Sequence, residues 1–302
     1  MTTSNVYKVF RWGTLLTSCF LFLSCVATKP CFFACVTIKP SPSKSRIALV
    51  VGNADYNVIR ALNNPVNDAK AMSKVLGDLD FEVIYQENAN KQMMETAIKN
   101  FEIRLKEARQ QHKKTVGLFY YSGHGAQNGD ENFLLPVGLK SSYESPNSLL
   151  ESETVALSSV LNSMKKAQST MNIIILDACR NKPNNLMLVD ASGKTKSIPK
   201  GLAWIDNTDS PDSSAPEGTF IAYATSPKKE AYDDGGKNSP YTKYLLEHIH
   251  ERDLSIEKLF KKVRQKVIKE TGGKQTPWES SSLKGDFSFK KIKPMVPIMI
   301  FK

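Results

Sequence analysis

The stretch Asn172-Ile173-Ile174-Ile175-Leu176-Asp177-Ala178-Cys179 decides the fold. Its continuous apolar run is typical of a parallel strand that is buried on both faces of a sheet. Further runs of this kind occur at residues 47–52, 81–85, 115–121 and 219–224. Helical patterns separate these runs along the chain. The alternation predicts an α/β fold, with a mostly parallel sheet covered by helices on both faces.

Helical periodicity locates the intervening elements. One helix opens at Asn64-Pro65, and the others are expected at residues 92–108, 155–167, 240–250 and 255–270. The last of these interleaves six basic side chains with apolar ones, which indicates an amphipathic helix. Its cationic face is either solvated or a contact with a membrane surface or partner.

Composition narrows the class of protein. The 302 residues are 41% hydrophobic and 24% charged, which excludes general disorder, collagen and a multi-span membrane protein. The net charge of +11 is unevenly distributed, because residues 45–250 carry 23 basic and 24 acidic side chains. A neutral central block argues against a nucleic-acid partner, which would need a positive surface.

The N-terminal segment has the character of an export or anchoring signal. Lys8 and Arg11 precede residues 12–28, which carry no charge. Cys19 and Cys25 each end a stretch that is similar to a bacterial lipobox, in which the cysteine becomes the lipidated N-terminus. An uncleaved membrane anchor is the alternative. Either way, we expect the folded domain to lie outside the cytoplasm.

The chain divides into a leader with linker at residues 1–44, a folded domain at 45–290 and a tail at 291–302. Within the domain, residues 180–218 lack periodicity and are expected to form a flexible insert. Four of the five cysteines precede residue 36, so disulfides do not staple the core. Cys179 is the single core thiol and is available for chemistry.

Two strand ends bring chemistry together. Ser122-Gly123-His124-Gly125 ends one apolar strand and Asp177-Ala178-Cys179 ends another. If these strands are neighbours, His124 and Cys179 emerge side by side, and an imidazole can accept the proton of a thiol. The N–H groups of Gly125 and Cys179 are then candidates for an oxyanion hole. The alternatives are a buried cysteine beside a turn histidine, a zinc site or a phosphate loop.

The same motifs resemble those of the caspase family, in which a histidine precedes the Ala-Cys-Arg motif by about 50 residues. Here the separation, from His124 to Cys179, is 55 residues. The resemblance spans roughly residues 46–285 and is strongest to the bacterial orthocaspases, which are related to metacaspases. It implies a caspase-like sandwich with a six-stranded sheet, and a cysteine endopeptidase with a Cys179–His124 dyad. A catalytically silent scaffold or regulator of the same fold is the alternative.

Substrate preference follows from departures from caspases that cut after aspartate. Such caspases carry glutamine where this chain has Asp177, and Ser-Trp-Arg where it has Ala231-Tyr232-Asp233. Asp68 matches an acidic position of metacaspase-like enzymes. Acidic walls favour a cationic side chain, so cleavage is expected after Arg or Lys. The alternatives are a helix N-terminal charge for Asp68 and a turn residue for Asp233.

The insert suggests processing. Lys194, Lys196 and Lys200 fit the expected specificity, which predicts autocleavage between residues 180 and 218. Asp206, Asp209 and Asp212 are candidates for calcium, an activator of many metacaspase-like enzymes, although they do not follow a calcium-loop pattern. We expect no required cofactor, no catalytic metal, and a monomer that acts on peptide substrates.

Overall fold

The protein is described by a computed structural model. The described residues are 44–140, 142–143, 145–179, 187–190, 195–197, 202, 215–226, 231 and 236–291. For residues 142–143, 146, 179, 187–190 and 195–197 this covers the backbone only. The leader at 1–43, most of the insert, Asp233 and the tail from residue 292 therefore lie outside the described residues.

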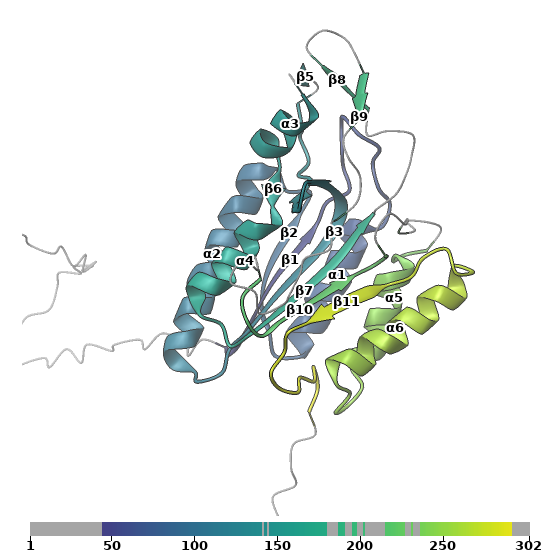
Figure 1. Cartoon of the computed structure of the whole chain (residues 1–302). Helices are drawn as coiled ribbons and strands as arrows, with labels where there is room; N and C mark the ends of the chain where they lie inside the picture. The colour runs from purple at the N-terminus through teal and green to yellow at the C-terminus, as the bar shows by residue number, and fades with distance from the viewer. Residues whose placement is uncertain are drawn as a thin grey trace, which may run out of the picture. The chain divides into compact units, whose positions relative to one another are not determined.

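A mostly parallel sheet forms the centre of the domain (Figure 1). Its strand order is β11-β10-β7-β3-β1-β2. All neighbouring pairs along this path are parallel except β10 with β11. The strands are β1 (Arg46–Gly52), β2 (Glu82–Glu87), β3 (Val116–Asn128), β7 (Met171–Cys179), β10 (Thr219–Tyr223) and β11 (Trp278–Ser281). This confirms the predicted six-stranded arrangement.

Among the described residues, helices cover both faces of this sheet (Figure 1). One face packs against α2 (Lys91–Gln111) and α4 (Leu157–Ala167). The other packs against α1 (Pro65–Asp78), α5 (Pro240–His248) and α6 (Ile256–Glu270). Each of these helices lies where the sequence pattern predicts one, with boundaries shifted by a few residues.

Strand side chains alternate between two separate cores. In β1, Ile47, Leu49 and Val51 belong to the core beneath α2 and α4, whereas Ala48 and Val50 belong to the core beneath α1, α5 and α6. The strands β3 and β7 alternate in the same way. Burial on both faces is why their sequences are continuously apolar instead of alternating with polar residues.

Smaller elements extend the main sheet beyond its carboxyl edge. β3 continues into an antiparallel pair with β4 (Glu131–Leu134), and β4 in turn pairs with β6 (Val155–Ala156). The short helix α3 (Pro146–Glu153) precedes β6. A separate sheet joins β5 (Ser142–Tyr143) to β8 (Met187–Asp190) and β9 (Thr195–Ser197). The insert thus contains two short strands that the sequence did not predict.

Three of the six basic side chains of α6 form ion pairs within the domain. Lys262 contacts Glu251, Arg264 contacts Glu279 and Lys266 contacts Glu247. The apolar side of the helix is buried. This arrangement favours the solvated-face interpretation over a membrane contact. Among the described residues, no helix combines the length and apolar character that crossing a bilayer requires.

Gly52 should be intolerant of any side chain, because a Cβ there would meet Pro65 O and would lie 2.6 Å from the Cβ of Ala69. We expect Gly52→Ala to lower the free energy of unfolding by about 2 kcal/mol or more, through overpacking at the β1–α1 contact. Gly77→Ala is the matched control, since nothing lies within 4 Å of its Cβ position. That change should stabilise α1 by up to about 1 kcal/mol. Urea unfolding midpoints measure both, and equal midpoints would contradict the prediction.

Candidate active site

The parallel pairing of β3 with β7 aligns the predicted site residues. In this register His124 is the partner of Cys179, and Ser122 is the partner of Asp177. Paired residues of neighbouring strands have backbones about 4.8 Å apart. Of Cys179 only the backbone is described, so its thiol lies outside the described part. The two residues proposed for acyl transfer thus occupy one rung of the sheet, at its carboxyl edge.

The His124 ring is held by a backbone carbonyl. Its Nε2 lies 2.7 Å from the carbonyl oxygen of Arg60. A carbonyl only accepts hydrogen bonds, so Nε2 carries the proton in the neutral ring and Nδ1 is left as the basic nitrogen. The side chain is 7% exposed. Burial lowers its pKa to about 4, so the ring is neutral near pH 7.

Two tyrosines fix the backbone around this histidine. The hydroxyl of Tyr56 accepts the His124 N–H at 2.9 Å and donates to the Leu135 carbonyl at 3.1 Å. The hydroxyl of Tyr121 donates to the His124 carbonyl at 2.8 Å. The rings of Tyr56 and His124 are 4.6 Å apart. Both the main chain and the ring of His124 are therefore constrained before any substrate arrives.

The glycines on either side of His124 leave room for these contacts. A Cβ on Gly123 would lie 2.7 Å from the Tyr121 hydroxyl and 2.8 Å from that of Tyr56. A Cβ on Gly125 would lie 2.8 Å from Cδ2 of Leu202, a buried residue of the insert. Gly123 is buried beneath the two hydroxyls, whereas Gly125 is partly exposed, as an N–H of an oxyanion hole must be.

A buried pair of carboxylates lies beside this rung. Asp177 Oδ2 accepts hydrogen bonds from the hydroxyls of Ser239 and Thr242, the latter at 2.6 Å. Since Thr242 gives its only proton to Asp177, the Tyr120 hydroxyl, 2.5 Å away, donates to Thr242. The N-terminus of α5 and the end of β7 are therefore joined through one carboxylate.

Asp68 reaches the same cluster from α1. Its Oδ1 accepts from the Asn238 amide at 2.8 Å and from the Ser239 N–H at 3.1 Å, and its Oδ2 accepts from the Ser122 hydroxyl at 3.4 Å. Burial, followed by repulsion from Asp177, raises the pKa of Asp68 to about 8. Within the described residues, no Lys or Arg forms an ion pair with Asp68. A positive charge near this pair would relieve the repulsion between the two carboxylates.

Most of the other predicted site residues are not described by the structure. Asp233, the calcium candidates Asp206, Asp209 and Asp212, and the lysines at 194 and 200 lie outside the described residues. For Lys196 the backbone in β9 is described. Among the described residues, no group of three or more histidines, cysteines and acids is placed to hold a metal ion.

Several site residues were not assigned a role from the sequence. Tyr56 and the Arg60 carbonyl orient His124 from a loop that shows no catalytic pattern, and a carbonyl contact leaves no trace in residue type. Ser239 was visible as a residue before proline, which is typical of a helix N-cap, and its hydroxyl does accept from the Thr242 N–H. Its second bond, to Asp177, depends on tertiary packing.

The chain is similar in sequence to known proteins. A family model of the caspase domain matches residues 45–288. The human (Homo sapiens) mucosa-associated lymphoid tissue lymphoma translocation protein 1 is 29% identical over 164 residues, 53% of this chain and 18% of that protein. Horse (Equus caballus) caspase-1 is 25% identical over 229 residues, 74% of this chain and 54% of that protein. The chain thus spans from about a fifth to about half the length of these relatives.

The raised pKa of Asp68 predicts a pH-dependent loss of stability. Between about pH 4 and pH 8 the folded chain holds a proton on this carboxyl that the unfolded chain releases, so stability falls as pH rises through this window. Asp68→Asn does not ionise. We expect the variant to gain stability relative to the parent chain from pH 5 to pH 8, measured by urea unfolding at each pH. Asp78→Asn, an exposed site on the same helix, should show no such gain; parallel pH profiles for parent and Asp68→Asn would refute the assignment.

Proposed function

Because this chain belongs to the caspase family, we propose that it is a cysteine endopeptidase that cleaves peptide bonds after Arg or Lys. The observation that carries this proposal is the pairing of His124 with Cys179 on one rung, beside a buried pair of carboxylates. The pairing supports acyl transfer, and the carboxylates support a cationic side chain at the cleaved bond.

The proposed reaction proceeds in two stages. Nδ1 of His124 takes the thiol proton of Cys179, and the thiolate attacks the carbonyl carbon of the scissile bond. The N–H groups of Gly125 and Cys179 stabilise the oxyanion. His124 then gives its proton to the leaving amine, which leaves a thioester. Water, deprotonated by the same nitrogen, attacks the thioester carbonyl and the C–S bond breaks. The peptide leaves as a carboxylic acid, and the proton on His124 returns to the sulfur of Cys179.

Specificity is assigned to the acidic cluster. Asp68 holds a proton in the unliganded chain, and an entering guanidinium or ammonium would lower its pKa, so that Asp68 joins Asp177 in supplying negative charge with little further loss of hydration. An aspartate side chain would meet repulsion in the same place. Asp233 is proposed as a third acidic residue that contacts the cationic side chain of the substrate.

A peptide panel tests the proposal. Fluorogenic peptides that differ only in the residue before the cleaved bond should be hydrolysed when it is Arg or Lys and resisted when it is Asp. Cys179→Ala should lower kcat/KM at least ~10⁴-fold. Asp177→Asn should lower it about 100-fold for Arg, because a buried charge pair loses one partner, with Asp78→Asn as the exposed control. A parent chain that hydrolyses no peptide would favour a silent scaffold, and unchanged turnover by Cys179→Ala would remove the dyad.

Autocleavage is proposed within the insert, and two observations support one of its candidate lysines over another. Lys196 lies in β9, where its backbone pairs with Leu188 of β8. Lys200 is two residues from Leu202, whose side chain is buried against Gly125. Two residues span at most about 7 Å, so the sequence distance from Lys200 to Leu202 supports cleavage after Lys200. Lys200 is therefore the favoured site.

Purified parent chain should separate into two fragments that meet at Lys200, whereas Cys179→Ala should stay intact. Lys200→Ala should lose this product, and Lys194→Ala serves as the matched control. Intact-mass spectrometry reads the junction directly. An active parent chain that remains whole would contradict autocleavage without affecting the peptidase proposal.

Three further properties complete the proposal. The leader, through Cys19, Cys25 or an uncleaved anchor, attaches the domain to a membrane or directs its export. The enzyme acts as a monomer, and calcium is an optional activator instead of a required cofactor. The peptide panel run with calcium chloride and with a chelator tests the metal requirement in the same preparation.

A further inference from the structure

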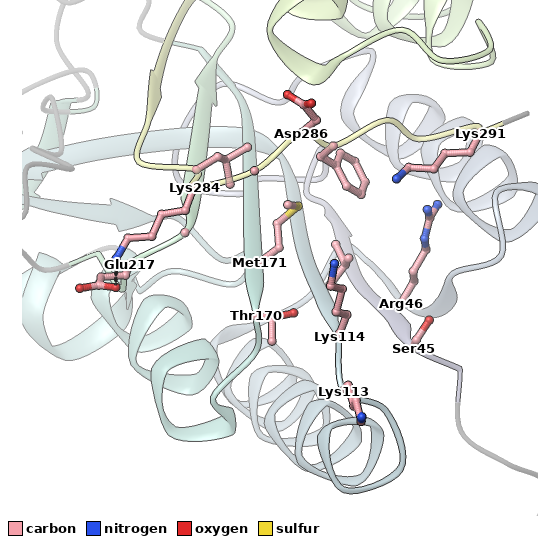
Figure 2. Close-up of a pocket in the computed structure, with 15 residues that line it drawn as sticks. Ser45, Arg46, Lys113, Lys114, Thr170, Met171, Glu217, Lys284, Asp286 and Lys291 are labelled. Carbon is pink, nitrogen blue, oxygen red and sulfur yellow. Dashed lines mark hydrogen bonds and ion pairs between the residues drawn. The ribbon is translucent and has the colours of Figure 1, made fainter.

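A second pocket lies at the edge of the sheet opposite the candidate active site (Figure 2). It has a volume of about 650 Å³. Arg46, Val116 and Met171, at the first residues of β1, β3 and β7, line it together with the segment around Phe287. From Val116 to His124 the strand runs for about 26 Å. This pocket therefore has no part in the proposed peptidase chemistry.

The pocket has an excess of cationic side chains. Its lining includes four basic side chains, Arg46, Lys113, Lys114 and Lys291. A fifth, Lys284, forms an ion pair with Glu217, so Asp286 is the one other acidic residue in the described lining. Within the described residues, no ion pair engages Lys114 or Lys291. Figure 2 shows the Lys291 amino group on the same side of the view as the Arg46 guanidinium, with the Lys114 amino group toward the middle. Such a group of cations attracts an anion.

Arg46 provides a fixed cation with an apolar wall. Its guanidinium lies over the rings of Phe81 and Phe287, 5.6 and 5.5 Å from their centres. It also donates to the carbonyl oxygen of Phe289 at 2.8 Å. Met171 and Leu283 extend the apolar lining. The pocket can thus accept a ligand that has both an anionic and an apolar part.

Both apolar terminal segments of the sequence join the domain at this pocket. The leader, with the uncharged residues 12–28, enters at Ser45, and the apolar residues 295–301 follow Lys291; Ser45 and Lys291 both line the pocket. The 17 positions from Thr28 to Ser45 span at most about 60 Å. If the leader is attached to a membrane, lipid headgroups are within reach of this edge.

From these observations we propose that the pocket binds the phosphate headgroup of an anionic phospholipid, on the face of the domain that is turned to the membrane. The inference rests on the proposed membrane attachment and does not require peptidase activity. Lys114, Lys291 and Arg46 contact the phosphate, and Phe287 and Met171 face the glycerol and the upper acyl chain. Each lysine near an anionic lipid surface contributes about fivefold in affinity.

The test uses the full chain with Cys179→Ala, which prevents self-cleavage, in non-ionic detergent micelles. Short-chain phosphatidylglycerol is titrated by calorimetry, with short-chain phosphatidylcholine, glycerol 3-phosphate and inorganic phosphate as comparators. We expect phosphatidylglycerol to bind saturably, and we expect no saturable binding of the three comparators. Adding Lys114→Gln and Lys291→Gln should weaken it about 25-fold. The control pair Lys258→Gln and Lys261→Gln removes the same charge from the exposed side of α6 and should leave binding unchanged.

Three results would overturn the proposal. Equal weakening in both double variants would mean diffuse charge attraction instead of a site. Equal binding of phosphatidylcholine would remove the need for an anion, and equal binding of glycerol 3-phosphate or inorganic phosphate would indicate a soluble ligand. Thermal unfolding of both double variants, and their peptide hydrolysis with Cys179 restored, should match the parent chain, which separates a lost site from a lost fold.

Discussion

The register between β3 and β7 is the constraint on which the rest of the site depends. Both strands are buried on two faces, so each residue is committed to one of two cores. A shift by a single residue would move Ile174 and Leu176 from one core to the other and reverse the environment of every neighbour. The same shift would take His124 away from Cys179. Hydrophobic packing along the strands therefore sets the alignment of two polar residues at their ends.

The buried carboxylates Asp68 and Asp177 lower the stability of the fold at the site. Two carboxylates buried close together raise the pKa of Asp68, which means that the folded state resists full ionisation of the pair. Hydrogen bonds from Ser239 and Thr242 offset part of the penalty, because the start of α5 supplies donors to both acids. This unfavourable interaction between the two carboxylates is the physical basis for the proposed preference for a cationic side chain, which would relieve it.

Much of this architecture could be predicted from local sequence, because a doubly buried strand and an amphipathic helix each leave a periodic pattern. The edge strand β11 could not, since Trp-Glu-Ser-Ser has no apolar run and gains its conformation by pairing with β10. The alignment of His124 with Cys179, and of Asp177 with Ser122, was predictable because these residues end neighbouring parallel strands; their catalytic roles stay predictions. Tyr56 and Arg60 were not predictable as site residues, because they act through a hydroxyl on a main-chain N–H and through a carbonyl, contacts that only the folded loop creates.

The parallel strand direction also places the candidate active site and the cationic pocket at opposite edges of the sheet. Every central strand runs in one direction, so all carboxyl ends meet at the edge that holds His124 and Asp177, and all amino ends meet at the opposite edge. The chain enters through β1 at that opposite edge, and its last described residue, Lys291, returns there. The two edges therefore divide the proposed roles: the carboxyl edge carries the residues proposed for peptide cleavage, and the amino edge carries the cationic pocket and the points where both terminal segments join the domain.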